Sequence, residues 1–236
     1  MKAPGVVAVL LAAALGLAGC NDAPSPFLQR TPTDWYIGPA EPSLLIVEYG
    51  DYECPPCSAA RKVVEEVRRS RPDLGFVYRH FPTRNHPNAI LAAEAAEAAG
   101  AQGQFWAMHE LMLERQAEWY MRPDAGERFA GFAGELSLDV PRFQADLGSH
   151  RARQRVMDAK KLAGRVGVRG APVFFVDGRR MRSPPIRAGD LMDEVRRAEE
   201  RRRSAGQGWV RPRPNSRRLS AACECNRLAL NPRPRR

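Results

Sequence analysis

The sequence contains only five cysteines, and their distribution cannot provide a disulfide framework. Cys20 stands alone, Cys54 pairs with Cys57, and Cys223 pairs with Cys225. Small scaffolds held by disulfides carry many cysteines spread along the chain, so this class is excluded. The four histidines and seven methionines form no tracts of the kind that bind soft metals, and no internal repeat is visible.

The part of the chain that is expected to fold is not basic, although the net charge of the whole sequence is +10. Residues 201–236 hold eleven arginines and one glutamate, so all the excess charge lies there and the remaining chain is neutral. The charge distribution therefore gives no support to nucleic-acid binding. Because its apolar residues show no period, we interpret 204–236 as a basic disordered tail.

The sequence has no apolar run long enough for a transmembrane helix. Val6–Leu17 follows a lysine at position 2 and is shorter than the roughly 20 residues that span a bilayer, so it fits a signal peptide. The run ends in Leu-Ala-Gly-Cys and resembles the lipobox of bacterial lipoproteins. The resemblance implies a lipoprotein signal peptide over 1–19, a lipidated Cys20, and a domain anchored to an envelope membrane and facing the periplasm or exterior. An ordinary signal peptide and a retained membrane anchor are the alternatives.

The next residues predict a tether and the start of an α/β domain. Residues 20–43 contain five prolines and are interpreted as the tether. A short apolar strand at 44–49, an amphipathic helix at 57–69 and an alternating strand at 74–80 follow.

Residues 86–165 show helical patterns only, and we interpret them as a helical insertion. A strand at 172–176 then leads to Asp177-Gly178, a strong hairpin signal, and a last helix is expected at 188–203. The fold class is therefore α/β, with one domain over 44–85 and 166–203 interrupted by helices.

Cys54 and Cys57 lie where a strand passes into a helix. Unpaired backbone N–H groups and the helix dipole favour a thiolate at Cys54. Cys57, one turn on, would resolve a mixed disulfide. Pro55 and Pro56 are tolerated in a first turn but remove donors, so we expect a moderately acidic Cys54.

Glu48 and Pro172 are two further candidates. An acid inside an apolar strand is costly unless it has a task, and a buried Glu48 could accept the Cys57 proton. The alternative is a glutamate exposed at a strand edge. Pro172 either simply begins a strand or follows a cis bond that frees Ala171 to pair with an extended substrate.

Four motifs in order resemble the DsbA-like branch of the thioredoxin superfamily: 47–57, 78–82, 86–109 and 166–178. The resemblance covers about 37–200. It implies a thioredoxin fold with an all-helical insertion, and a catalytic set made of a nucleophile, a resolving thiol, an acid and a cis-proline: Cys54, Cys57, Glu48 and Pro172. Two departures concern the direction of electron flow: Pro55-Pro56 replaces the usual Pro-His, and Ala171 stands where many relatives have Thr or Val.

These observations predict a protein disulfide oxidoreductase that acts on envelope proteins, with the oxidase direction favoured. It would need no metal or organic cofactor besides the Cys54–Cys57 disulfide, and a membrane redox partner would recycle it. The alternatives are a copper-binding thiol chaperone, a redox-inert scaffold, and a zinc site shared with Cys223 and Cys225. The four histidines are scattered, and we assign them structural or surface roles: His80, His86, His109 and His150.

Overall fold

The computed structural model describes residues 25–206. The chain divides into two units, 1–198 and 199–236, and the described part of the second is the end of the last helix. The predicted signal peptide, the lipidation site Cys20, and the tail from 207 onward with its cysteine pair lie outside the described residues. None of the helices within 25–206 has the length and apolar character needed to span a bilayer.

A five-stranded mixed sheet forms the centre of the first unit, with the order β1-β3-β2-β4-β5. The parallel pair β2 and β3 is connected by α1, and the other neighbours pair antiparallel. The strands are β1 Trp35–Ile37, β2 Leu45–Gly50, β3 Gly75–His80, β4 Val173–Val176 and β5 Arg179–Arg180.

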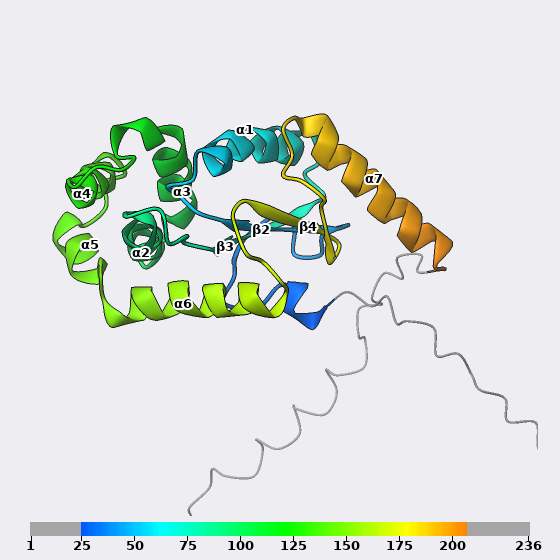
Figure 1. Ribbon diagram of the computed structural model, residues 1–236, viewed down its shortest axis with the longest axis horizontal. Coiled ribbons are helices and arrows are strands. Elements are labelled where there is room, and N and C mark those ends of the chain that lie inside the picture. Colours follow the sequence, from blue (N-terminus) through cyan, green and yellow to red (C-terminus); the bar gives the residue numbers. More distant parts are fainter. Residues whose placement is uncertain (1–24, 207–236) are drawn as a thin grey trace, which may run out of the picture. The chain divides into compact units, whose positions relative to one another are not determined.

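Helices cover both faces of this sheet (Figure 1), with α1 and α7 on one side and α6 on the other. Helices α2 to α6 all lie between β3 and β4 in the sequence, so the predicted fold class with a helical insertion is confirmed. The α-helices are α1 Pro55–Ser70, α2 Ala89–Gly100, α3 Phe105–Glu114, α4 Ala125–Glu135, α5 Val140–Asp146, α6 His150–Arg165 and α7 Ala188–Ser204; short 3₁₀ turns occupy Pro26–Leu28 and Gln116–Glu118.

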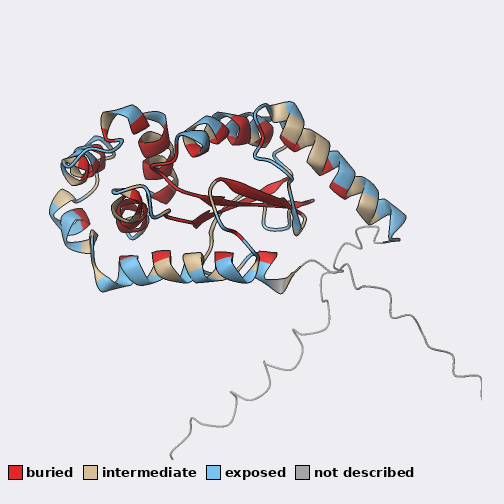
Figure 2. Ribbon diagram, viewed as in Figure 1, coloured by how far each residue is buried: buried red, intermediate tan, exposed pale blue. Residues whose placement is uncertain are grey.

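The central strands are buried on both faces, as Figure 2 shows. Successive side chains of a strand point to opposite faces, so Ile46 packs in the cluster with α1 while Val47 packs in the cluster with the end of α6. A polar side chain at any central position of β2 is therefore taken out of water.

Two turns follow the backbone chemistry that their residues predict. Gly148 has φ +74° and separates α5 from α6, whose N-cap Ser149 accepts a hydrogen bond from Ala152 N at 3.2 Å. Asp177 and Gly178 both have positive φ and close the hairpin between β4 and β5.

The predicted tether at 20–43 is wrong for its described part. Residues 35–37 form β1 and pair with β3 in antiparallel register. Asp34 makes a two-pronged ion pair with Arg79 of β3 at 2.7–2.8 Å, and both side chains are at least 93% buried. The guanidinium also donates to the carbonyls of Phe27 and Gln29. A charged group buried in the sheet needs these partners, and they fix the proline-rich segment to the domain.

Candidate active site

Cys54 and Cys57 lie at the start of α1, in the turn that follows β2. Cys54 is the N-cap residue with extended backbone angles, and Cys57 lies in the first helical turn. Both are free thiols; Cys54 is 6% exposed and Cys57 is fully buried. The Asp51 N–H donates to Cys57 Sγ at 3.4 Å. Cys54 therefore keeps a small exposed area, whereas Cys57 has none.

The two thiols differ in acidity. A hydrogen bond from the Cys57 thiol is the main cause that lowers the pKa of Cys54 from its usual 9.0 to about 7, and burial opposes it. The backbone N–H of Cys57 and the charge of His86 lower it further, whereas Asp51 raises it. Burial, followed by the neighbouring Cys54, raises the pKa of Cys57 well above its usual value. Near neutral pH, Cys54 therefore ionises much more readily than Cys57, which keeps its proton.

Glu48 lies on β2, the central strand, opposite Tyr78 of β3 and Phe174 of β4. It is 3% exposed, so the alternative of a water-exposed edge glutamate is wrong. Burial raises the pKa of Glu48 to about 8, and the charges of Glu110 and Cys54 add to the shift. A carboxyl group in this state carries a proton at neutral pH. The charge of an ionised Glu48 would in turn raise the pKa of the Cys57 thiol.

Ala171 and Pro172 border the cysteines from the other half of the domain. The Ala171–Pro172 peptide bond is cis, the form that the family resemblance implies. The Cys54 thiol donates to the Ala171 carbonyl at 3.4 Å. Although 117 residues separate them in sequence, Cys54 and Ala171 are in contact.

Sequence reasoning missed a buried polar cluster beside the cysteines. The Asp51 side chain is fully buried and accepts hydrogen bonds from Thr83 N at 2.9 Å, Thr83 Oγ1 at 2.7 Å and His86 Nδ1 at 2.7 Å. Through its backbone, Asp51 also accepts from Cys54 N at 3.1 Å. The sequence signal for Asp51 is its place in the turn three residues before Cys54, but no pattern connects it with His86.

Glu53, the residue directly before Cys54, connects the turn to the helical insertion. Its carboxylate is fully buried and accepts hydrogen bonds from Asn88 Nδ2 at 2.9 Å, Asn88 N at 2.5 Å and Met121 N at 2.8 Å. Two buried carboxylates therefore hold the turn before Cys54. Asp51 connects it to the loop after β3, and Glu53 connects it to Asn88 and Met121 of the helical insertion.

A groove of about 560 Å³ opens beside Cys54. The start of α1, the loop after β3, one residue of α6 and the loop before β4 line it: Cys54–Pro56, Phe81–His86, Lys160 and Arg169–Ala171. Its position next to the exposed edge of Cys54 suits an extended peptide that presents a sulfur atom.

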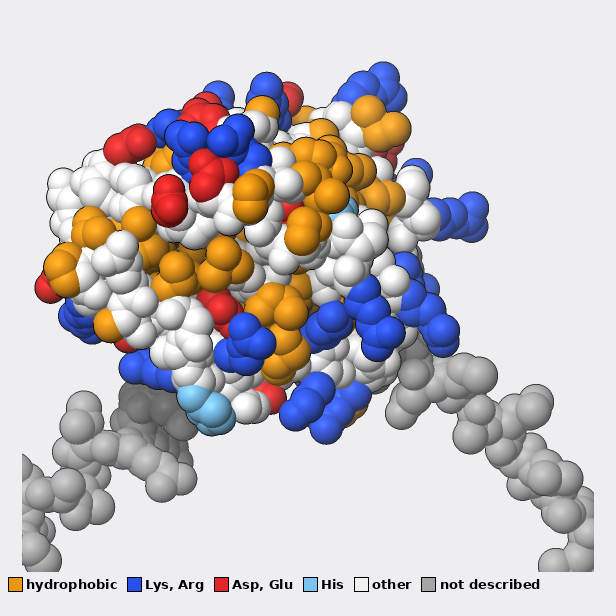
Figure 3. Space-filling view, turned by 60° about the vertical axis from the view of Figure 1, so that its left-hand side comes forward, with side chains coloured by type: hydrophobic (Ala, Val, Ile, Leu, Met, Phe, Trp, Pro, Cys, Tyr) orange, Lys and Arg blue, Asp and Glu red, His pale blue; other side chains and the backbone are white. Residues whose placement is uncertain are grey.

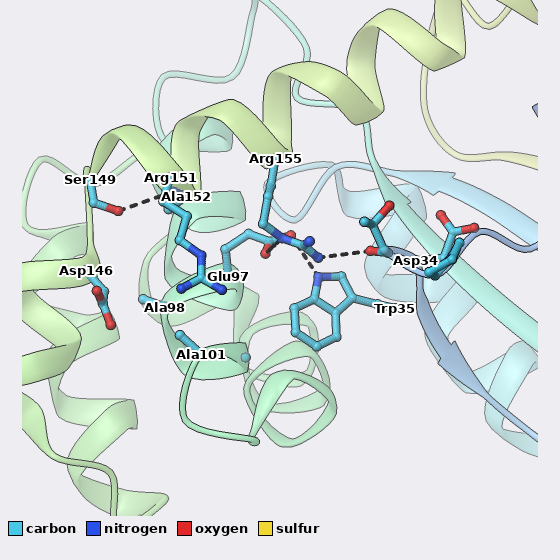
Figure 4. Close-up of a pocket in the computed structure, with 13 residues that line it drawn as sticks. Asp34, Trp35, Glu97, Ala98, Ala101, Asp146, Ser149, Arg151, Ala152 and Arg155 are labelled. Atoms are coloured by element: carbon cyan, nitrogen blue, oxygen red, sulfur yellow. Dashed lines mark hydrogen bonds and ion pairs between the residues drawn. The ribbon is translucent and has the colours of Figure 1, made fainter. Parts of the chain in front are cut away.

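A second cavity, of about 250 Å³, lies between α2, the start of α6 and the segment before β1 (Figure 4). Its central carboxylate, Glu97, accepts from Trp35 Nε1 at 2.7 Å and pairs with Arg155 and with His80 at 2.9 Å. Arg155 also donates to the Thr33 carbonyl. The hydrogen bonds of Glu97 to Trp35 and Arg155 connect β1 to the insertion.

Comparison with known proteins assigns the chain to a family. Residues 30–190 match the family described as Thioredoxin. The chain belongs to the thioredoxin family. The fold is shared with solved structures of alpha-DsbA1 from Wolbachia pipientis and BdbD from Bacillus subtilis, each 16% identical to this chain.

Two solved structures illustrate the similarity of this thioredoxin-family protein to known folds. A thioredoxin-like oxidoreductase from Silicibacter pomeroyi has a TM-score of 0.65 and 28% identity, covering 75% of this chain and 99% of that one. Wolbachia pipientis alpha-DsbA1 has a TM-score of 0.67 and 16% identity, with 76% and 97% covered.

The curated relatives are much longer proteins. A Na(+)/H(+) antiporter NhaA 1 from Salinispora arenicola is 44% identical over 148 residues, which are 62% of this chain and 22% of that protein. The NhaA of Herminiimonas arsenicoxydans is 38% identical over 169 residues, with 70% and 26% covered. This chain spans only about a quarter of the length of the two antiporters.

Proposed function

We propose that this thioredoxin-family protein is a thiol–disulfide oxidoreductase that exchanges disulfides with cell-envelope proteins through Cys54 and Cys57. One observation carries the proposal: an accessible thiol with a pKa of about 7 lies at a helix start beside a buried thiol whose pKa is raised. This asymmetry separates the roles of nucleophile and resolving group.

In the oxidase direction, a substrate thiolate attacks Cys54 Sγ of the oxidised protein. The Cys54–Cys57 bond breaks, a mixed disulfide forms at Cys54, and Cys57 leaves as a thiolate. A second substrate thiolate then attacks the substrate sulfur and releases Cys54 as a thiolate. The substrate gains a disulfide, and its two electrons remain in the Cys54–Cys57 dithiol until a membrane redox partner accepts them.

Glu48 and Ala171 have separate tasks in these steps. A protonated Glu48 gives its proton to the Cys57 thiolate as that thiolate leaves, and takes it back when the dithiol is reoxidised. The carbonyl of Ala171, adjacent to Cys54, accepts a hydrogen bond from the substrate backbone once the thiol no longer donates to it. Pro172 fixes the edge of this groove, and Pro55 and Pro56 leave Cys54 without N–H donors from those two positions.

The oxidase direction rests on the acidity of Cys54. A stable Cys54 thiolate favours the reduced form of the protein, so the oxidised form readily passes its disulfide to a substrate. Lipidation of Cys20 would hold the enzyme at an envelope membrane near its recycling partner. The relatives named as antiporters support a place at a membrane, because an antiporter moves ions across one.

Three measurements test the proposal. The reduction potential of the dithiol, taken from glutathione equilibria, should lie well above that of thioredoxin at about −270 mV. Oxidised protein should refold a reduced disulfide protein, and Cys57→Ser should accumulate mixed disulfides that Cys54→Ser does not form. Tight one-to-one Cu(I) binding without any exchange activity would instead establish the copper chaperone.

A further inference from the structure

The groove beside Cys54 carries charge of one sign. Arg84, Lys160 and Arg169 line it, and none of its lining residues is an aspartate or glutamate. The carboxylate that bonds to the lining residues Thr83 and His86 belongs to Asp51, which is fully buried. The basic side chains therefore face the groove without an acid in its lining to balance them.

Arg84 and Arg169 are exposed and unpaired. Within residues 25–206 neither guanidinium makes a hydrogen bond or an ion pair, whereas Arg115 holds both Glu118 and Glu135. Figure 3 shows one face of the molecule, where some basic side chains lie among acidic ones and others lie apart from them. A guanidinium without a partner keeps its five donors for an incoming carboxylate.

The two arginines belong to different loops that meet at the nucleophile. Arg84 lies in the loop between β3 and α2, and Arg169 lies two residues before Ala171, whose carbonyl contacts Cys54 Sγ. Lys160 projects from α6 and is held by the Pro82 carbonyl at 2.7 Å. A peptide that presents sulfur to Cys54 would lie between these charges.

We propose that Arg84 and Arg169 select substrates with aspartate or glutamate next to the reacting cysteine. The inference rests on the proposed exchange activity and names its substrate class: acidic segments of partially folded proteins. Opposite charges at a groove raise the rate of productive encounter, and the effect declines as salt screens it.

The test uses the oxidised full chain and three dithiol peptides that differ only in the residues beside the cysteines, which are aspartate, serine or lysine. Quenched-flow kinetics give the rate of peptide oxidation. Each rate is divided by the rate of the same peptide with hydroxyethyl disulfide, which corrects for differences in the acidity of the peptide thiols.

At low ionic strength the corrected rate for the aspartate peptide should exceed that for the lysine peptide by about 10-fold or more. The ratio should decline toward about 2-fold in 0.5 M salt. Arg84→Glu/Arg169→Glu should reverse the order of the peptides. The matched control Arg151→Glu/Arg182→Glu changes the net charge equally at exposed positions outside the groove and should leave the order unchanged.

Equal corrected rates for all three peptides, with rapid oxidation, would overturn the inference and leave the proposed function intact. Reversal of the order in the control variant would also overturn it, because net charge and not the groove would then be responsible. Failure to oxidise any of the peptides would remove the proposed function and this inference with it.

Discussion

Replacing Glu48 with glutamine should remove a specific dependence of stability on pH. The carboxyl group has a pKa of about 8 in the folded protein and an ordinary value of 4.5. Between these values the folded protein holds a proton that the unfolded chain has lost. Stability is therefore fully present below pH 4.5 and declines as the pH rises toward 8.

The magnitude follows from the size of the shift. Each pH unit in this interval costs the wild type about 1.4 kcal/mol, so the whole shift corresponds to about 5 kcal/mol, and the interval from pH 5 to 7 to about 2–3 kcal/mol. Glutamine has nearly the same shape and does not titrate. The stability difference between wild type and Glu48→Gln should change by these amounts.

Urea unfolding at half-unit steps from pH 5 to 8 measures this difference. Both proteins should carry Cys54→Ala, because the Cys54 thiol titrates in the same interval and contributes to the shift of Glu48. They should also carry Cys57→Ala, so that no thiol that interacts with Glu48 remains. A difference that stays constant over this range would refute the conclusion that burial keeps Glu48 protonated.

Three further changes test other parts of the structure. His86→Gln removes a charge that favours the Cys54 thiolate, so the midpoint of its absorbance at 240 nm should move above pH 7, and no movement would exclude a role for His86. Asp34→Asn leaves a guanidinium buried without its carboxylate and should cost about 3–5 kcal/mol in urea unfolding; a loss below 1 kcal/mol would contradict this. Gly100→Ala would place a methyl group 2.4 Å from an indole carbon of the β1 tryptophan, so it should lower stability by about 1–3 kcal/mol, and an unchanged thermal midpoint would show that the packing relaxes freely.

The sequence predicts the domain well where apolar periodicity is strong. The strand at 44–49 and the helix at 57–69 agree with β2 and α1 to within two residues, since a central strand and an amphipathic helix leave clear patterns. β1 was missed because three residues are too few to show alternation and prolines surround them. The place of β1 in the sheet depends on the ion pair between Asp34 and Arg79, which joins segments that are far apart in the sequence.

Local sequence likewise predicts some parts of the candidate site and not others. The positions of Cys54 and Cys57 at a helix start, and of Glu48 in a buried strand, follow from local sequence. The Asp51–His86 hydrogen bond and the unpaired state of Arg84 depend on how the loop after β3 folds back over the turn. Local sequence contains no signal for such a tertiary contact.

The anchoring of Glu53 has a mechanical consequence. The amides of Asn88 and Met121 both donate to this one carboxylate, and Cys54 is the next residue in the chain. If the helical block shifts relative to the sheet, it must either break these hydrogen bonds or pull the backbone of Cys54 with it. A protein that docks on the outer helices thus has a direct route for altering the position of that sulfur, without touching the groove.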